Sequence, residues 1–198
     1  MPADTENEPN FDEIKRLLAR GLVMNTAKEV AEGKRDEAFE VARADEERTL
    51  RTWCRGKKNI PTALEAVWDL TPEKFYLALD GAYPGNHASA AFVIIEADID
   101  EVNRRLTTAA SRDKDPWHAQ YKRKSCGIAY RWLKGTAVTP PLLREVQGQI
   151  HIEGGMHRFH LARHYGTTRM PFLVQEAELA AVLALIPSAA LGAVHTEI

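Results

Sequence analysis

The chain has 198 residues, a hydrophobic content of 44% and a formal net charge of −2. This length fits one large domain, or one domain with a helical extension, and the apolar content is sufficient for a folded core. Charge is distributed unevenly: Met1–Arg51 contains thirteen acidic and nine basic residues, whereas Arg104–Arg144 contains ten basic and two acidic residues. The chain therefore lacks the overall basic charge of many nucleic-acid-binding proteins, but it has one basic segment.

Cysteine usage and hydropathy indicate the cellular setting. The only cysteines are Cys54 and Cys126, and no ligand-spacing motif surrounds them. No basic segment followed by an apolar stretch opens the chain, and no run approaches the roughly 20 apolar residues of a membrane span. We expect a soluble protein in a reducing cytoplasm, without membrane insertion.

The first half of the chain is predicted to be helical and then mixed. Residues 1–10 are polar, acidic and proline-containing, which is typical of a disordered tail. From Phe11 to Trp53, apolar residues recur every three to four positions, with breaks at Gly21 and Gly33. This spacing predicts two or three amphipathic helices.

An αβ region is expected to complete the N-terminal part, which we assign to residues 11–112. Pro61 suits the first turn of a short helix through Trp68. The apolar runs Phe75–Leu79 and Ala91–Ile95 flank a segment rich in turn residues and are predicted to be paired strands. Asp98 is predicted to cap a helix that continues to Leu106.

Residues 113–198 are predicted to form a second part with alternating helices and strands. The expected elements are a helix over Trp117–Leu133, strands over Thr139–Arg144 and Ile150–Ile152 around a Gln147-Gly148 turn, a helix over His157–Tyr165, a strand over Phe172–Val174, and a C-terminal helix over Ala177–Leu191 interrupted at Pro187. This order predicts an α/β (α+β) fold.

The sequence Gly154-Gly155-Met156-His157-Arg158 joins a predicted strand to a predicted helix. Two glycines at such a junction leave backbone N–H groups accessible beside the positive end of a helix, and this arrangement suits a phosphate. An arginine can hold phosphate oxygens with two parallel bonds, and a histidine can donate a hydrogen bond or exchange a proton. Glycines at strand-to-helix turns also serve backbone geometry alone, so both interpretations remain open.

The wider sequence IHIEGGMHRFHLARHYGTTRMPFLV resembles the ParB/sulfiredoxin superfamily. The shared pattern is a strand, a Gly-x-His/Arg-Arg loop, an alanine one turn later, a helix-stopping glycine and a proline-led strand. The resemblance runs from about Asp115 to Gln175. It implies that Gly154, Gly155, His157 and Arg158 surround the phosphates of ATP or another nucleotide. Lys124 falls at the position of a phosphate-contacting lysine in sulfiredoxins, although Gly127 and Arg131 replace the neighbouring hydroxyl residues of that family.

Two departures from the superfamily restrict the expected activity. Met156 stands at the position of the sulfiredoxin cysteine, and a thioether cannot act as that nucleophile, so the chain is not expected to be a functional sulfiredoxin. Chromosome-partitioning ParB proteins usually carry an acidic residue there and a helix-turn-helix domain after the motif. Because Met156 is not acidic and 23 residues follow Gln175, we do not expect a centromere-binding clamp. The nuclease and nucleotide-hydrolase branch remains, with Glu153 as the candidate carboxylate that would activate water, alone or with Mg²⁺. A strand-end surface acid is the alternative interpretation of Glu153.

Two further groups of residues are candidates for binding. His157, His160 and His164 share one helical face and could hold a metal with Glu153, although ordinary helix positions explain His160 and His164 equally simply. Lys122, Arg123 and Lys124 form a cluster near four aromatic residues, Trp117, Tyr121, Tyr130 and Trp132. Positive charge beside aromatic rings suits single-stranded nucleic acid, but buried aromatics between solvated lysines would give the same pattern.

The resulting functional expectation is a nucleotide-binding phosphate-ester hydrolase, an ATPase or DNase. The domain arrangement also resembles plasmid fertility-inhibition proteins of the oncogenic-suppression type, which implies a role in conjugation. Two alternatives remain open. The chain could be a non-catalytic interaction protein that blocks a conjugation or type IV secretion machine, or a DNA-binding regulator.

Overall fold

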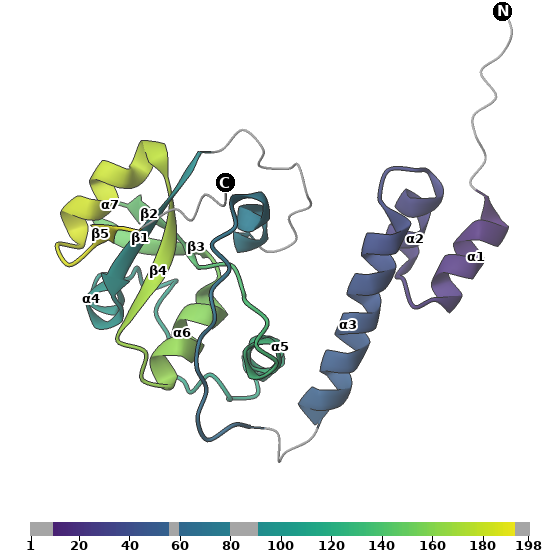
Figure 1. Cartoon of the computed structure of the whole chain (residues 1–198), viewed down its shortest axis with the longest axis horizontal. Helices are drawn as coiled ribbons and strands as arrows, with labels where there is room; N and C mark the ends of the chain where they lie inside the picture. The colour runs from purple at the N-terminus through teal and green to yellow at the C-terminus, as the bar shows by residue number, and fades with distance from the viewer. Residues whose placement is uncertain (1–9, 56–59, 80–90, 193–198) are drawn as a thin grey trace, which may run out of the picture. The chain divides into compact units, whose positions relative to one another are not determined.

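The computed structural model describes residues 10–55, 60–79 and 91–192 and divides into two compact units, Met1–Gly56 and Lys57–Ile198 (Figure 1). The boundary between these units differs from the expected boundary at 112/113. Strand β1 (Phe92–Asp98) pairs with β4 (Arg169–Gln175), so part of the expected N-terminal region belongs to the same sheet as the glycine loop. Residues 1–9 of the predicted tail lie outside the described residues.

The described residues of the N-terminal unit form three helices, which confirms the prediction made from the periodicity of the sequence. These are α1 (Phe11–Ala19), α2 (Met24–Ala31) and α3 (Glu37–Arg55). Gly21 and Gly33 separate them, and both adopt a positive φ that glycine tolerates. The helices enclose a core of their own, made of Ile14, Leu17, Leu22, Ala27, Val30 and Val41.

The second unit is built on a five-stranded mixed sheet with the order β3-β2-β4-β1-β5. Its elements are η2 (Pro72–Ala78), β1, α4 (Ile99–Arg104), α5 (Lys122–Leu133), β2 (Leu142–Val146), β3 (Gln149–Gly154), α6 (Met156–His164), β4, η3 (Glu176–Glu178), α7 (Leu179–Leu185) and β5 (Ala190–Leu191). Strands β2 and β4 are parallel, and the other neighbours are antiparallel. The predicted α/β (α+β) class is confirmed.

The predicted turn at Gln147-Gly148 joins β2 to β3. Both residues have positive φ, 51° and 77°. Two successive residues of this kind match the twist of an antiparallel hairpin. This turn fixes the register in which Leu143 faces Ile152, and it directs β3 toward the glycine pair.

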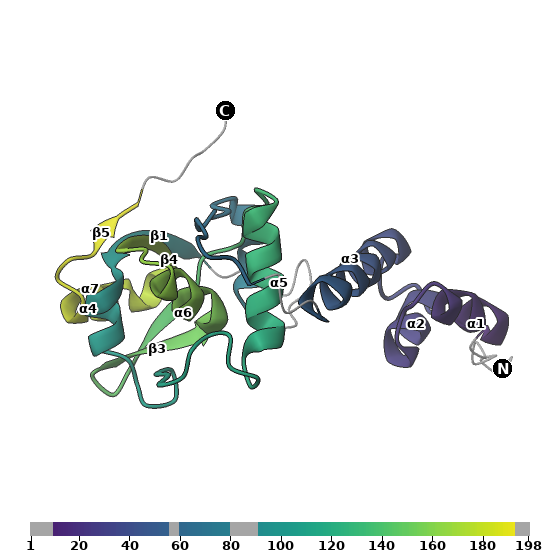
Figure 2. The ribbon, with the colours of Figure 1, turned by 90° about the horizontal axis from the view of Figure 1, so that it is seen from below.

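Helices cover both sides of the sheet (Figure 1). On one side, α6 packs Phe159 against Phe172 of β4. Helix α5 lies beside α6 on this side (Figures 1 and 2). On the other side lie α7 and the 3₁₀ helix η2. Helix η2 contributes Phe75 and Ala78 to a cluster with Ile94, Leu142 and Leu173.

Two predicted elements of the middle region are wrong. Phe75–Leu79 falls in η2 rather than in a strand, because Pro72 starts the helix and the three-residue spacing of Phe75 and Ala78 buries both on one face. Pro61–Trp68 is extended rather than helical. Its backbone is held by pairing with the chain after α5, where the Val138 N–H donates to the Val67 carbonyl at 2.9 Å.

Helix boundaries also differ at two places. Helix α5 begins at Lys122 rather than Trp117, because Asp115 and Pro116 lead into turns. The predicted C-terminal helix is divided into η3 and α7, and its last residues form β5 beside β1. Asp98 caps α4 as predicted by accepting from the Glu101 N–H at 2.7 Å, but α4 ends at Arg104.

Candidate functional site

The two glycines of the loop are required by geometry. Gly155 is the N-cap of α6 with a φ of 85°, and a Cβ there would lie 2.8 Å from the Pro141 Cα. Gly154 ends β3, where a Cβ would lie 1.9 Å from the Ala78 carbonyl oxygen. The loop therefore combines a left-handed turn with a close approach of η2 to the end of the strand.

Arg158 lies beneath this loop and is 6% exposed. Its guanidinium donates to the carbonyl of Thr139 and to the carbonyl of Ala78 at 3.0 Å, with a longer contact of 3.4 Å to Leu77. These acceptors belong to the segment before β2 and to η2. The structure thus places Arg158 where it joins three parts of the chain through buried, charge-assisted hydrogen bonds.

His157 lies at the first turn of α6 and is half-buried in a cluster with Arg112 and Tyr121. An Arg112 guanidinium nitrogen lies 3.1 Å from His157 Nδ1, and the guanidinium carbon lies 4.1 Å from the centre of the Tyr121 ring. The Tyr121 and His157 rings are 5.9 Å apart. Because arginine can only donate, Nδ1 must accept, and the proton of the neutral imidazole then resides on Nε2.

Arg112 carries the positive charge of this cluster, and no acidic side chain among the described residues neutralises it. Burial lowers the pKa of Arg112 from its ordinary value, although an arginine stays protonated. Within the described parts of the chain, no carboxylate lies within ion-pairing distance of Arg112. The first turns of α5 and α6 contain no acidic residue either. A partly desolvated cation without an acid partner is a favourable place for an external anion.

The predicted basic cluster lies next to this site in the chain. Lys122, Arg123 and Lys124 form the first turn of α5, directly after Tyr121. Arg123 and Lys124 are exposed and Lys122 is half-buried. Since Tyr121 contacts His157, the structure brings the beginning of α5 and the beginning of α6 to the same region of the second unit. All three lysine and arginine residues thus add positive potential beside the loop.

Glu153 precedes the glycines on β3 and faces a different set of partners. Its carboxylate lies 3.8 Å from Arg144, and the same arginine lies 3.4 Å from Glu178. Both Glu153 and Arg144 are substantially exposed. Among the described residues, no group of three or more His, Cys, Asp or Glu side chains is arranged to hold a metal ion.

The three histidines of α6 serve different contacts. His160 is buried, and its Nε2 lies 3.0 Å from the Ala110 carbonyl. Burial lowers the pKa of His160 to about 4, so the ring is neutral and donates this bond. His164 lies 3.6 Å from Asp115, and His157 contacts Arg112. The predicted helical face is therefore divided among three separate contacts.

Arg112 and the contact role of Tyr121 were missed at the level of the sequence. Arg112 precedes His157 by 45 positions and lies in an irregular segment, so no local motif connects them. Its membership of the basic segment Arg104–Arg144 was the available signal.

No helix in the described ranges is both long and apolar enough to cross a membrane. Comparison of the chain with protein-family models, with curated proteins and with solved structures gives no match.

Proposed function

We propose that the second unit binds a phosphate group of a nucleotide at the beginning of α6. The observation that carries this proposal is the half-buried Arg112, which has no acidic partner in the described structure. Its guanidinium contacts His157, in the first turn of α6 directly after Gly155. A phosphate there would meet a guanidinium and the positive end of a helix.

Each residue has a distinct role in this proposal. Arg112 supplies the charge, and the Nε2–H of His157 supplies a neutral donor. Lys122 and Lys124 raise the local potential and would contact a second phosphate. Arg158 does not need to touch the ligand: its bonds to Thr139 and Ala78 keep the loop in the conformation that the ligand requires.

A relationship to the ParB/sulfiredoxin superfamily is part of the same proposal. It is supported by the succession α5, β2, β3, α6 and β4, with the glycine pair at the junction of β3 and α6. We extend the proposal to a role in plasmid transfer or fertility inhibition, and this extension is based on the sequence resemblance alone.

Hydrolysis of a phosphate ester is proposed as a second step, in which the Glu153 carboxylate would act as the base that activates water. The ion pair of Glu153 with Arg144 is long and exposed, so releasing the carboxylate costs at most about 1 kcal/mol. Turnover of ATP that requires Mg²⁺ and is lost in Glu153→Gln would support this step. Retained turnover in Glu153→Gln would assign the base elsewhere.

Calorimetric titration with ATP and with CTP, each with Mg²⁺, tests the binding step. We expect binding by the wild type and a loss of at least tenfold in affinity for Arg112→Gln, which corresponds to about 1.4 kcal/mol. Arg104→Gln is the matched control, because Arg104 is an exposed arginine at the end of α4. Equal affinities for wild type and Arg112→Gln, or no binding by the wild type, would refute the proposal.

Single-stranded DNA is the second ligand to titrate, because the first turn of α5 offers three successive cations. Binding to DNA through phosphates weakens steeply with salt. Lys124→Ala is compared with Lys134→Ala at the opposite end of the same helix. A larger loss of DNA affinity in Lys124→Ala than in Lys134→Ala would indicate a ligand with several phosphates. Equal and small losses of DNA affinity in the two variants would restrict the site to a nucleotide.

A further inference from the structure

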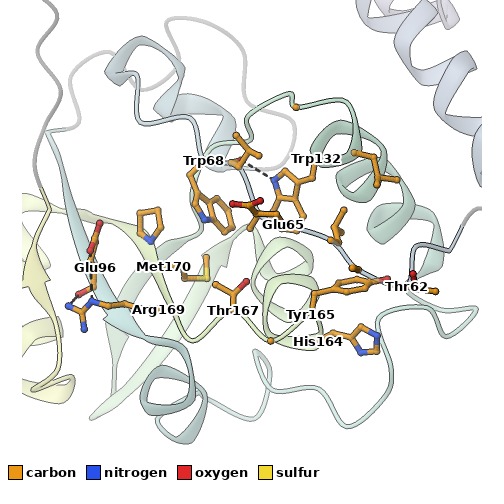
Figure 3. Close-up of a pocket in the computed structure, with 18 residues that line it drawn as sticks. Thr62, Glu65, Trp68, Glu96, Trp132, His164, Tyr165, Thr167, Arg169 and Met170 are labelled. Carbon is orange, nitrogen blue, oxygen red and sulfur yellow. Dashed lines mark hydrogen bonds and ion pairs between the residues drawn. The ribbon is translucent and has the colours of Figure 1, made fainter.

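A second candidate binding site lies at the other end of α6, away from the glycine loop. It is an open pocket of about 1290 Å³ whose wall includes residues after α6, the start of β4, the end of α5 and the extended segment before η2. In Figure 3, Glu96 and Arg169 lie toward one end of the lining, and Thr62 and His164 toward the other.

The extended segment that forms one wall is held firmly on both sides of the pocket. At its beginning, the Tyr165 hydroxyl donates to the Pro61 carbonyl at 2.8 Å. Further along, the Trp132 indole N–H donates to the Val67 carbonyl at 3.0 Å. Residues 62–66 therefore cross between two anchored points, which makes this wall preorganised for a ligand.

The charges in the pocket leave one carboxylate uncompensated. Arg169 lies 3.8 Å from the Glu96 carboxylate and also donates to two backbone carbonyls. His164 lies 3.6 Å from Asp115. Glu65 is exposed, and within the described structure its carboxylate has no ion pair and no hydrogen bond. The pocket therefore presents a net negative charge to a ligand.

Aromatic rings lie in the same lining. Trp68 and Trp132 are in edge-to-face contact, with ring centres 5.3 Å apart and an angle of 77° between the planes. Trp132 is buried and its N–H is already used, whereas Trp68 is partly exposed in the pocket. A tryptophan face attracts cations more strongly than other aromatic rings, and a nearby carboxylate adds to this attraction.

We propose that this pocket binds an organic ammonium group, with its alkyl substituents on Trp68 and its charge toward Glu65. The half-buried side chain of Leu64 in the lining offers apolar contact to those substituents. The ammonium group belongs either to a small amine or to a lysine side chain of a peptide. This proposal is independent of phosphate binding, since no residue assigned to the phosphate lines the pocket.

The test compares ligands of the same shape but different charge. Choline and its uncharged analogue 3,3-dimethyl-1-butanol are titrated into the full-length chain, and the indole N–H signal of Trp68 is followed by NMR. We expect choline to shift this signal with at least tenfold higher affinity than the alcohol. Similar affinities for the two probes would show that only apolar contact matters and would overturn the proposal.

Variants and a peptide probe complete the experiment. Glu65→Gln is expected to weaken choline binding about twofold to fivefold, as for an exposed charge pair. Glu73→Gln, an exposed glutamate on η2 outside the pocket, should leave the affinity unchanged. A lysine-containing peptide that binds more tightly than choline would identify a protein partner, and weaker binding would identify a small amine. Absence of a Trp68 shift with both probes would refute the site.

Discussion

At the scale of single residues, Arg158 is the clearest case of a motif residue with an internal contact. Its charge is buried and satisfied by carbonyls of Thr139 and Ala78, which belong to distant parts of the chain. A sequence motif specifies that an arginine follows the glycines, but it does not specify whether the guanidinium faces a ligand or the backbone. Arg158 therefore supports the site by ordering it.

Replacing Arg158 by alanine is expected to lower the free energy of unfolding by about 3 kcal/mol, because several buried carbonyls lose a charged donor. Urea denaturation measures this change. Arg163→Ala on the same helix is the control, since Arg163 makes an exposed ion pair with Asp100 and should cost no more than about 1 kcal/mol. Equal stabilities of the two variants would contradict the assignment.

His160 is expected to make stability dependent on pH. Its pKa is lowered to about 4 in the folded chain by burial, from 6.5. The unfolded chain therefore binds a proton at higher pH than the folded chain does. The stability from this residue is fully present above pH 6.5 and is lost as the pH falls from 6.5 toward 4.

The loss at pH 5 relative to pH 7 should be about 2 kcal/mol for this one group. In His160→Gln the difference in unfolding free energy between these two pH values should be smaller by this amount. All other titrating groups are common to both proteins, so the comparison isolates His160. The same pH dependence in both proteins would show that the buried imidazole is not the cause.

At the scale of elements, local patterns predicted those structures whose causes are local. The apolar spacing of Phe11–Trp53 predicted two or three helices, and the described residues form three. The turn at Gln147-Gly148 and the start of α6 followed from glycine chemistry. In contrast, Pro61–Trp68 and Phe75–Leu79 depend on contacts with residues far along the chain. Their conformations are set by pairing with Val138 and by packing on Leu142 and Leu173.

The packing of η2 on the end of β3 can be tested at Gly154. An alanine there would collide with the Ala78 backbone, so Gly154→Ala should lower the free energy of unfolding by about 2 kcal/mol or more. Gly135→Ala is the comparison, because Gly135 has a φ of 69° but open space around it. Its cost should be about 1 kcal/mol, from backbone strain alone.

Hydrogen exchange separates these two effects. Gly154→Ala should speed exchange of the amides in η2, whereas Gly135→Ala should leave η2 unchanged. A Gly154→Ala protein with normal stability and normal exchange in η2 would show that the packing of η2 does not depend on the close contact between Gly154 and Ala78.

At the scale of the whole molecule, the chain consists of two units with separate cores, one around Leu17 and one around the mixed sheet. The sequence predicted the helical first part, the fold class and the basic segment. It did not predict that β1 joins the sheet, because strand partners are chosen by long-range packing. It also did not connect Arg112 to His157, since an irregular segment carries no periodic signal.

NMR of the full-length chain during titration with ATP and Mg²⁺ tests phosphate binding at the beginning of α6 most directly. We expect the largest shifts at the backbone amides of Gly155 to Arg158 and at the Arg112 Nε–H, and all of these shifts should follow one saturable binding curve. Saturable binding whose shifts lie elsewhere, or no shift at these groups, would contradict phosphate binding at this site.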